Sequence, residues 1–357
     1  DGIHAAAIVI SPDTITKFLP IQQKGSNAEI VTQYEMHTVE QLGLLKMDFL
    51  GLRNLSIVDR TLELIGSESL DIDNLKLDDE KTFKLFAEGK MTGVFQLESR
   101  VAQSTSRSLK PKRFEDIVAL VALIRPGPLG AGMHNEFADR ANNRKEIEYL
   151  HSDLESILNE TYGVILYQEQ VMQIAEKIAG FNLQEADNLR VAMGKKIPKV
   201  MEEQRKKFTD GAVSKNYSEQ FAIELFDQIA YFAGYGFNKS HSVPYALLAY
   251  QTAYLKANYP AEYIAACLTA VKRDKDRTAI FLSEARDMGV KVSTPDVNLS
   301  SSDFTVNDNE ILFGLSAVRN VGDITADKIV LERESNGHFE SIEDFLSRID
   351  SRSLNKR

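Results

Sequence analysis

The sequence of 357 residues has a single cysteine and contains no apolar run of roughly 18 residues or more. One cysteine, Cys267, excludes an internal disulfide and a cysteine-based zinc site, and it fits a reducing, cytoplasmic compartment. No transmembrane helix is therefore expected. The first residues lack a basic segment followed by a long apolar one, so no signal peptide is predicted. The sequence also lacks an initiator methionine, which indicates a piece of a longer protein.

Positive charge is not in excess, because the sequence has 42 Lys and Arg and 52 Asp and Glu, which gives a net charge of -10. This balance argues against a general nucleic-acid-binding protein, which usually presents a basic face. Basic residues nevertheless gather in residues 100–113, 190–207 and 231–256, where acidic residues are few or absent. Such patches on an acidic body suit a protein that grips phosphates in a defined groove, although solvated helix faces give the same pattern.

The apolar periodicity changes along the chain. Strand patterns occupy residues 5–11, 18–22, 29–33 and 43–50, with a turn at 24–27, and helical spacing begins at residue 54. Asp78 or Asp79 is expected to cap a helix that stops at Gly89. Further helices are expected over residues 114–124, 164–179, 183–193, 200–212, 218–231, 242–257 and 260–272. A Ser-rich stretch at 292–302 marks a boundary, beyond which residues 311–315 read as a strand.

Residues 43–51 form an apolar stretch bounded by glycines that contains one cation, Lys46, and one carboxylate, Asp48. Its length and composition predict a buried strand. Because side chains alternate across a strand, Lys46 and Asp48 share one face and the apolar side chains take the other. A buried charge is costly unless it is paired or binds a metal. The two residues therefore either form a structural ion pair or serve a phosphate and a metal ion.

Seven stretches spread over nearly the whole chain match one family in the same order. They read GIHAA (2–6), KMDFLGLRNL (46–55), GVFQLES (93–99), RPGPL (125–129), YGVILYQEQ (162–170), RVAMGKK (190–196) and GFNKSHS (236–242). Together they resemble the C family of bacterial replicative DNA polymerases, the DNA polymerase III alpha subunits. Each motif alone is weak, and seven in order are far more specific.

The resemblance implies an α+β chain with three parts. Residues 1–53 would be the C-terminal part of a β-rich palm, 54–290 a large, mostly α-helical fingers domain, and 291–357 the start of a clamp-binding domain that contains a helix-hairpin-helix motif. That motif is placed at residues 318–324, where Asn320 stands in place of a family glycine. Asn tolerates left-handed backbone geometry, so the turn is expected to persist.

The resemblance assigns catalysis to Asp48 and Lys46. Asp48 would be one ligand of two Mg²⁺ ions, and Lys46 would approach the phosphates as a point charge. The family's other two aspartates would lie before Asp1. Asp71-Ile72-Asp73 has a suitable spacing but sits in a polar stretch, and we interpret it as a turn or cap. The chain alone is therefore expected to lack polymerase activity.

The resemblance places nucleotide contacts in two stretches. Arg190, Lys195 and Lys196 lie at a helix expected to end at Met193-Gly194, so that both lysines project from its end. Cations at a helix C-terminus are also favourable without any ligand.

The second stretch precedes a helix whose expected cap is Ser240 or Ser242. Free backbone N–H groups there, with Lys239 and His241 and no acidic residue close by, would form an anion site. Phe237 or Tyr235 is available to stack on a base. The alternative is that the histidine is only a hydrogen-bond partner at a cap.

Contacts to primer-template DNA are expected from a set of basic residues and one glycine. They are Arg53, Arg107, Lys110, Arg125 and Gly322. Arg125 begins a rigid loop over residues 125–130, for which a structural elbow is the alternative. Gly322 would offer a helix N-terminus to a DNA phosphate.

The implied partners are primer-template DNA, an incoming deoxynucleoside triphosphate and, through regions mostly outside this chain, the sliding clamp and other replisome subunits. Two alternatives stay open. One is a non-catalytic, helical DNA-binding or scaffold protein in which Lys46 and Asp48 form a structural pair. The other is an error-prone accessory homologue of the same family.

Overall fold

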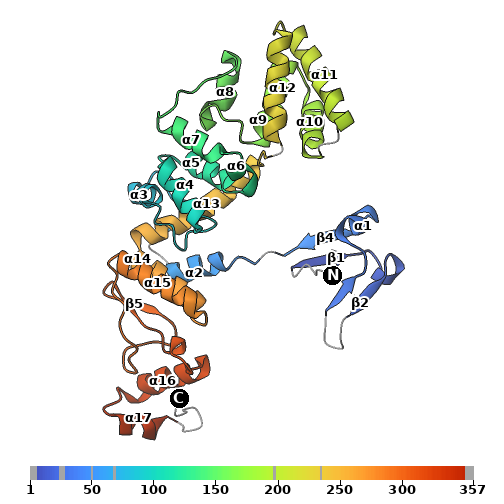
Figure 1. Ribbon diagram of the computed structural model, residues 1–357. Coiled ribbons are helices and arrows are strands. Elements are labelled where there is room, and N and C mark those ends of the chain that lie inside the picture. The colour runs from blue at the N-terminus through green and yellow to red at the C-terminus, as the bar shows by residue number, and fades with distance from the viewer. Residues whose placement is uncertain are drawn as a thin grey trace. The chain divides into compact units, whose positions relative to one another are not determined.

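The computed structural model describes residues 6–23, 29–49, 51–66, 70–195, 198–233 and 235–349. It divides into two compact units, Asp1–Ser56 and Ile57–Arg357. Short strands dominate the first unit and helices dominate the second (Figure 1). The α+β class with a large helical part, expected from the sequence, is therefore confirmed. None of the described helices is long and apolar enough to cross a membrane.

The first unit contains two antiparallel strand pairs and one short α-helix. Its elements are β1 (Ala7–Ile10), η1 (Ile15–Lys17), β2 (Ile21–Gln23), β3 (Ile30–Thr32), α1 (Met36–Gln41) and β4 (Leu45–Asp48). All four expected strands are present, each shorter than the pattern indicated, and the turn expected at 24–27 lies outside the described residues. Strand β1 pairs with β4, with Ala7 opposite Asp48 and Val9 opposite Lys46. Strand β2 pairs with β3.

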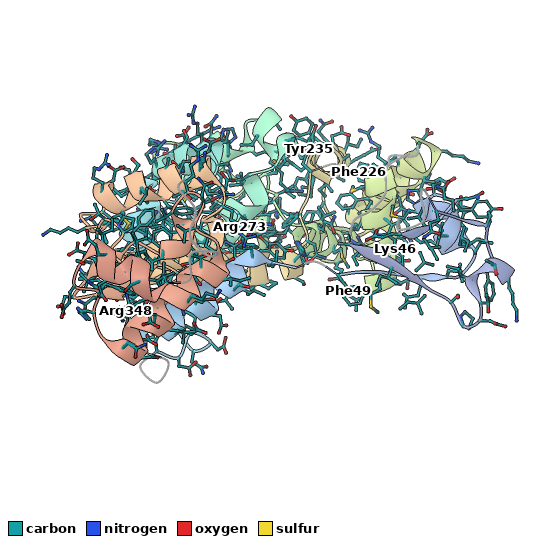
Figure 2. All side chains as sticks on the ribbon, turned by 90° about the horizontal axis from the view of Figure 1, so that it is seen from below. Lys46, Phe49, Phe226, Tyr235, Arg273 and Arg348 are labelled. Atoms are coloured by element: carbon teal, nitrogen blue, oxygen red, sulfur yellow. The ribbon has the colours of Figure 1, made fainter. Side chains whose placement is uncertain are left out.

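The prediction that β4 is a buried strand is wrong. Leu45, Met47 and Phe49 are 56%, 39% and 57% exposed, and Figure 2 labels Phe49 and Lys46 on this unit. The covered face is the other one, where Val9, the neighbour of Lys46 across the ladder, packs on a small core. That core consists of Leu19, Val39 and Leu44. The described β1–β4 sheet has two strands, and this core covers only one of its faces.

The second unit is a succession of helices followed by a small hairpin and a final helix pair. Its α-helices are α2 (Arg53–Ile65, beginning in the first unit), α3 (Glu80–Glu88), α4 (Arg100–Leu109), α5 (Phe114–Leu123), α6 (Pro126–Gly130), α7 (Met133–Ala141), α8 (Glu155–Leu158), α9 (Gln168–Ala179), α10 (Leu183–Lys195), α11 (Pro198–Ser214), α12 (Glu219–Ala233), α13 (Lys239–Asn258), α14 (Pro260–Val271), α15 (Lys275–Asp287), α16 (Asp323–Asn336) and α17 (Ile342–Arg348). The other elements are η2 (Ser152–Leu154), η3 (Asn159–Thr161), β5 (Thr305–Asn307), β6 (Glu310–Leu312) and η4 (Leu315–Ala317).

Local signals placed several helix ends correctly. Asp79 caps α3 by accepting a hydrogen bond from Thr82 N at 2.8 Å, and Gly89 ends it in the left-handed conformation with φ 66°. Pro260 opens α14, as expected. Helix α9 begins at Gln168, four residues later than predicted. The preceding residues are extended because Tyr167 forms a parallel bridge with Phe237, a contact between distant segments.

The helical unit has three main apolar clusters. One surrounds α5 and α13, a second joins α9 to α12, and a third packs α14 and α15 against the β5–β6 hairpin. Cys267 is fully buried in the third cluster, as its apolar helix predicts. Lys256 is also fully buried, although it belongs to a stretch whose basic residues the sequence placed on a phosphate-binding surface.

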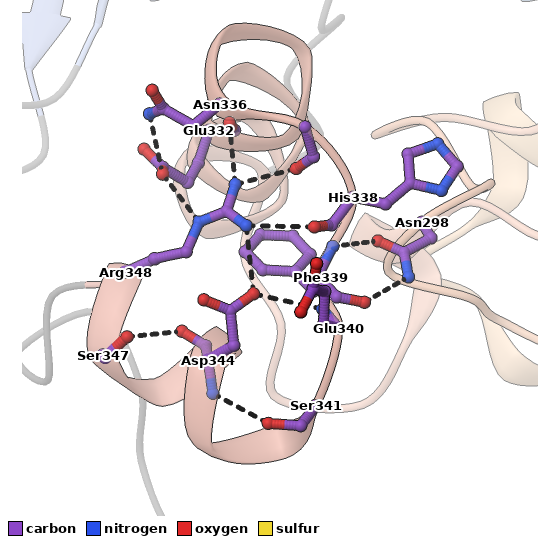
Figure 3. Close-up of polar contacts among 11 residues, drawn as sticks. Asn298, Glu332, Asn336, His338, Phe339, Glu340, Ser341, Asp344, Ser347 and Arg348 are labelled. Atoms are coloured by element: carbon purple, nitrogen blue, oxygen red, sulfur yellow. Dashed lines mark hydrogen bonds and ion pairs between the residues drawn. The ribbon is translucent and has the colours of Figure 1, made fainter.

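The last helices are held together by Arg348, whose guanidinium lies 4.3 Å from the ring centre of Phe339. It donates to Glu332 Oε1 at 3.0 Å and to Asp344 Oδ2 at 3.1 Å (Figure 3). It also donates to the carbonyl of Gly337 at 2.8 Å. The Arg348 guanidinium therefore binds several carbonyl and carboxylate oxygens and links α17 to the end of α16.

Candidate functional site

Lys46 and Asp48 form an ion pair on strand β4. Lys46 Nζ donates to Asp48 Oδ1 at 2.7 Å and to Oδ2 at 2.8 Å. Strand alternation places both residues on one face, as predicted. The side chain of Lys46 is 15% exposed and that of Asp48 is 52% exposed. The carboxylate is thus open to solvent while the lysine lies against the sheet, an arrangement compatible with a structural pair and with a metal ligand.

The Asp-x-Asp sequence is a turn. Asp71 Oδ1 accepts from Asp73 N at 3.2 Å, and Oδ2 accepts from Asn74 Nδ2 at 2.7 Å. The Asn74 hydrogen bond lowers the pKa of Asp71 below its usual value. The interpretation of Asp71 and Asp73 as a local turn is confirmed. Among the described residues, no group of three or more His, Cys, Asp or Glu side chains is arranged to hold a metal ion.

Helix α10 carries Arg190 and runs on to Lys195, so the expected end at Met193-Gly194 is wrong. Among the described residues, no atom from outside the adjoining helix backbone and the chain neighbours lies within 4 Å of a Cβ placed at Gly194. Lys195 is therefore a helical residue and not part of a cap, and Lys196 lies outside the described residues. Arg190 donates from Nε to Asp187 Oδ1 at 2.9 Å, one turn earlier. This pair is partly exposed.

The start of α13 differs from the prediction in two respects. The cap is Asn238, whose side chain accepts from His241 N at 2.9 Å, and not Ser240 or Ser242. The buried Ser242 hydroxyl instead donates to the Val118 carbonyl at 2.7 Å. An earlier cap is possible because Asn is as good an N-cap as Ser.

The expectation that no acidic residue lies near Lys239 is also wrong. Lys239 N donates to both carboxylate oxygens of Glu169, at 3.0 and 2.9 Å. Lys239 Nζ donates to Glu160 Oε2 at 2.6 Å. Both acids come from residues 70 or more positions earlier, so local composition could not reveal them. Sequence reasoning missed Glu160 and Glu169 for this reason, although Glu169 lies inside the YQEQ motif.

The aromatic residues near this helix start already have partners. Phe237 lies under the guanidinium of Arg125 at 4.3 Å and beside His241 at 5.5 Å between ring centres. His241 packs more closely on Tyr245, at 4.3 Å. Tyr235 contacts Tyr231, and its carbonyl accepts from Arg125 at 2.6 Å.

Arg125 is the N-cap of the short helix α6 (Pro126–Gly130), so the prediction of a rigid loop over 125–130 is wrong. Pro126 occupies the first helical position, where its missing N–H costs no hydrogen bond. Arg125 also donates to the Ala122 carbonyl at 2.9 Å. Burial lowers the pKa of Arg125 below its usual value. Its guanidinium therefore joins α5 and α6 to the segment before α13.

The other predicted DNA contacts lie at separate places. Arg53 is exposed at the start of α2, and Arg107 and Lys110 are exposed at the end of α4. Gly322 is the N-cap of α16. Asn320 has φ 67°, so the left-handed turn expected for an asparagine in this position is confirmed.

A carboxylate stands directly after Gly322. Asp323 accepts from Lys272 Nζ at 2.6 Å and pairs with Arg273, and these cations hold the pKa of Asp323 below its usual value. The sequence analysis did not identify this cluster, which links the start of α16 to the end of α14.

Comparisons with known proteins agree along the chain. Residues 1–51 match the model of the bacterial DNA polymerase III alpha NTPase domain, and residues 54–216 match that of the bacterial DNA polymerase III alpha subunit finger domain. Residues 289–357 match a helix-hairpin-helix motif.

The chain also aligns over its whole length with curated relatives named DNA polymerase III subunit alpha. It is 48% identical to the protein of Thermus aquaticus over 365 residues, 43% identical to that of Mycobacterium tuberculosis over 363, and 44% identical to that of Escherichia coli K12 over 369. These alignments cover 30%, 31% and 32% of the respective relatives, so the chain spans about a third of their length. From its first strand to its last helix pair, the chain belongs to the bacterial DNA polymerase III alpha subunit family.

Proposed function

We propose that this chain is part of a DNA-directed DNA polymerase that transfers a deoxynucleoside monophosphate to a primer 3′-hydroxyl and releases pyrophosphate. The proposed division is 1–53 for the palm, 54–290 for the fingers and 291–357 for the start of the clamp-binding domain. The observation that carries the proposal is the ion pair on β4, in which the carboxylate of Asp48 is half exposed. The pair lies in the stretch matched by the alpha subunit family.

Asp48 fits a divalent cation such as Mg²⁺ as one ligand, because carboxylate oxygens suit that ion and the Asp48 side chain is half exposed. Two bound Mg²⁺ ions would supply activation of the primer 3′-hydroxyl and neutralisation of the leaving pyrophosphate. We place the remaining ligands outside the described residues. Lys46 orients the Asp48 carboxylate and presents a positive charge to phosphate.

Five residues are proposed to contact the triphosphate, and five to contact DNA. The first group is Arg190, Lys195, Lys196, Lys239 and His241, and the second is Arg53, Arg107, Lys110, Arg125 and Gly322. Arg125 would make its DNA contact from a guanidinium that also donates to the Tyr235 carbonyl and lies over the Phe237 ring. We further propose a cytoplasmic protein that works with a sliding clamp.

The test is Asp48→Asn in a full-length alpha subunit that contains this sequence. A metal ligand predicts that kcat for primer extension falls by at least about 100-fold, as for other groups that face developing charge. Binding of primer-template DNA should persist, because the change is local. Asp71→Asn, which alters an exposed turn aspartate, is the matched control and should retain activity.

A non-catalytic scaffold role would leave extension by the Asp48→Asn variant close to that of the unchanged protein. A second measurement uses the chain by itself. We expect no primer extension from it, and robust Mg²⁺-dependent synthesis would show that its own residues complete the site.

A further inference from the structure

A carboxylate from another helix of the chain binds the N-terminus of α13. Glu169, in the first turn of α9, accepts from Lys239 N with both oxygens and from Ser240 N at 3.4 Å. A helix N-terminus carries a partial positive charge and unpaired N–H groups, and an anion there is stabilising. The carboxylate of Glu169 therefore joins the first turns of two helices whose sequences are 70 residues apart.

The side chain of Lys239 is fixed by the same segment that supplies Glu169. Its Nζ donates to Glu160 Oε2 at 2.6 Å and lies 5.5 Å from the centre of the Tyr167 ring. Glu160 is itself held in place, since Arg113 donates to its carbonyl oxygen at 2.8 Å. Segment 160–169 thus contacts Lys239 at both its backbone and its ammonium group.

The backbone around this contact is also paired. Phe237 N donates to the Leu166 carbonyl at 3.1 Å, and Gln168 N donates to the Phe237 carbonyl at 2.9 Å. These backbone hydrogen bonds lead to the start of α13, where Lys239 N donates to Glu169. Since Lys239 and His241 lie within the first turn of α13, the position of that turn determines where both side chains begin.

We propose that Glu169 is a positioning residue that sets the first turn of α13 so that Lys239 and His241 meet the nucleotide phosphates. This inference rests on the proposed function, because it needs Lys239 to be a nucleotide contact. Groups that hold a contacting side chain in place reduce the cost of ordering it when the ligand binds. Glu169 does not touch the nucleotide in this assignment and acts through the backbone of Lys239.

The test compares Glu169→Gln with the unchanged protein in a full-length alpha subunit that contains this sequence. The amide keeps the shape but loses the charge and part of the accepting capacity, so the first turn of α13 is held less firmly. We expect the KM for dATP in primer extension to rise about 10-fold, the lower end of effects seen for residues that orient a contacting group. The value of kcat should change by less than about 2-fold, because the reacting atoms are not touched.

Two controls separate positioning from general stability. Glu176→Gln changes another acidic residue of α9 for which no contact to α13 is found among the described residues, and it should leave KM unchanged. Asn238→Ala removes the side-chain cap of α13 but leaves Glu169 in place. If Asn238→Ala raises KM as much as Glu169→Gln at an equal loss of melting temperature, helix stability alone explains the effect and the inference is overturned.

Lys239→Ala distinguishes failure of the inference from failure of the proposed function. If KM for dATP does not rise in Lys239→Ala, the nucleotide contact itself is absent. If KM rises in Lys239→Ala but is unchanged or lower in Glu169→Gln, the contact exists and Glu169 does not position it. A lower KM would identify Glu169 as an internal competitor for phosphate.

Discussion

Lys46 Nζ lies within 2.8 Å of both carboxylate oxygens of Asp48, yet the two partners differ in exposure, at 15% for the lysine and 52% for the aspartate. The lysine is therefore the sheltered member of the pair. Its ammonium orients the carboxylate of a side chain that is half exposed. The role of Lys46 in catalysis can therefore be tested separately from that of Asp48.

Lys46→Met removes the charge and keeps most of the side chain's volume. Because Lys46 is proposed to face phosphate and to orient Asp48, we expect kcat in primer extension by the full-length protein to fall at least about 10-fold. The free energy of unfolding should change by less than about 1 kcal/mol, since one partner of the pair is largely exposed. Single-nucleotide incorporation and urea unfolding measure the two quantities.

Lys17→Met is the matched control for this change. Lys17 lies in the same unit and pairs with Asp13, and both side chains are more than half exposed. Its replacement should leave kcat unaltered. A well-folded Lys46→Met protein with undiminished kcat would reduce the Lys46–Asp48 pair to a structural contact.

Local features of the sequence predicted local structure. Asp79 and Gly89 mark the two ends of α3 because a cap and a left-handed glycine act within one helical turn. Asn320 was expected in the left-handed region for the same kind of reason. The end of α10 was misplaced at Gly194, because a single glycine weakens a helix without ending it.

Contacts between distant segments could not be predicted from one sequence. Glu160 and Glu169 contact Lys239 where two distant segments meet, at the bridge between Tyr167 and Phe237. The exposure of the apolar face of β4 has a similar origin, since burial depends on what packs against a strand and not on the strand alone. Alternation did predict that Lys46 and Asp48 share a face, because that relation is internal to the strand.

A second prediction concerns the stability contributed by Lys256, whose side chain is only 1% exposed. Its Nζ donates to the carbonyls of Lys90 and Thr92 at 2.7 and 2.8 Å and to Glu284 Oε1 at 2.6 Å. Burial lowers the pKa of Lys256 below its usual value, despite the nearby carboxylate. Lys256→Met would leave Glu284 and two carbonyls without their donor, so we expect a loss of about 3–5 kcal/mol in the free energy of unfolding.

Chemical unfolding of the chain, followed by helical circular dichroism, measures this loss. Lys206→Met removes one member of an exposed pair with Asp210 and should cost less than about 0.5 kcal/mol. Adding Glu284→Leu to Lys256→Met should recover part of the stability, since the unpaired carboxylate is then gone. A loss for Lys256→Met no larger than that for Lys206→Met would contradict a structural role for the buried pair.

Gly211 supports the last prediction, which concerns the contact between α9 and α11. A Cβ atom at Gly211 would lie 2.2 Å from the carbonyl oxygen of Ala179, the last residue of α9. Backbone atoms cannot yield as a flexible side chain does, so α11 would have to move away from α9. We expect Gly211→Ala to destabilise the chain by about 1–3 kcal/mol, the usual cost of overpacking.

Gly194→Ala is the matched control, because Gly194 is also inside a helix but, among the described residues beyond its own helix backbone and chain neighbours, no atom lies within 4 Å of the added Cβ. There alanine should stabilise the helix by up to about 1 kcal/mol, its ordinary advantage over glycine. The two variants make the same chemical change, so opposite shifts of the urea midpoint would isolate the effect of the close approach. Equal stabilisation by both would mean that α9 and α11 do not pack as closely as this structure places them.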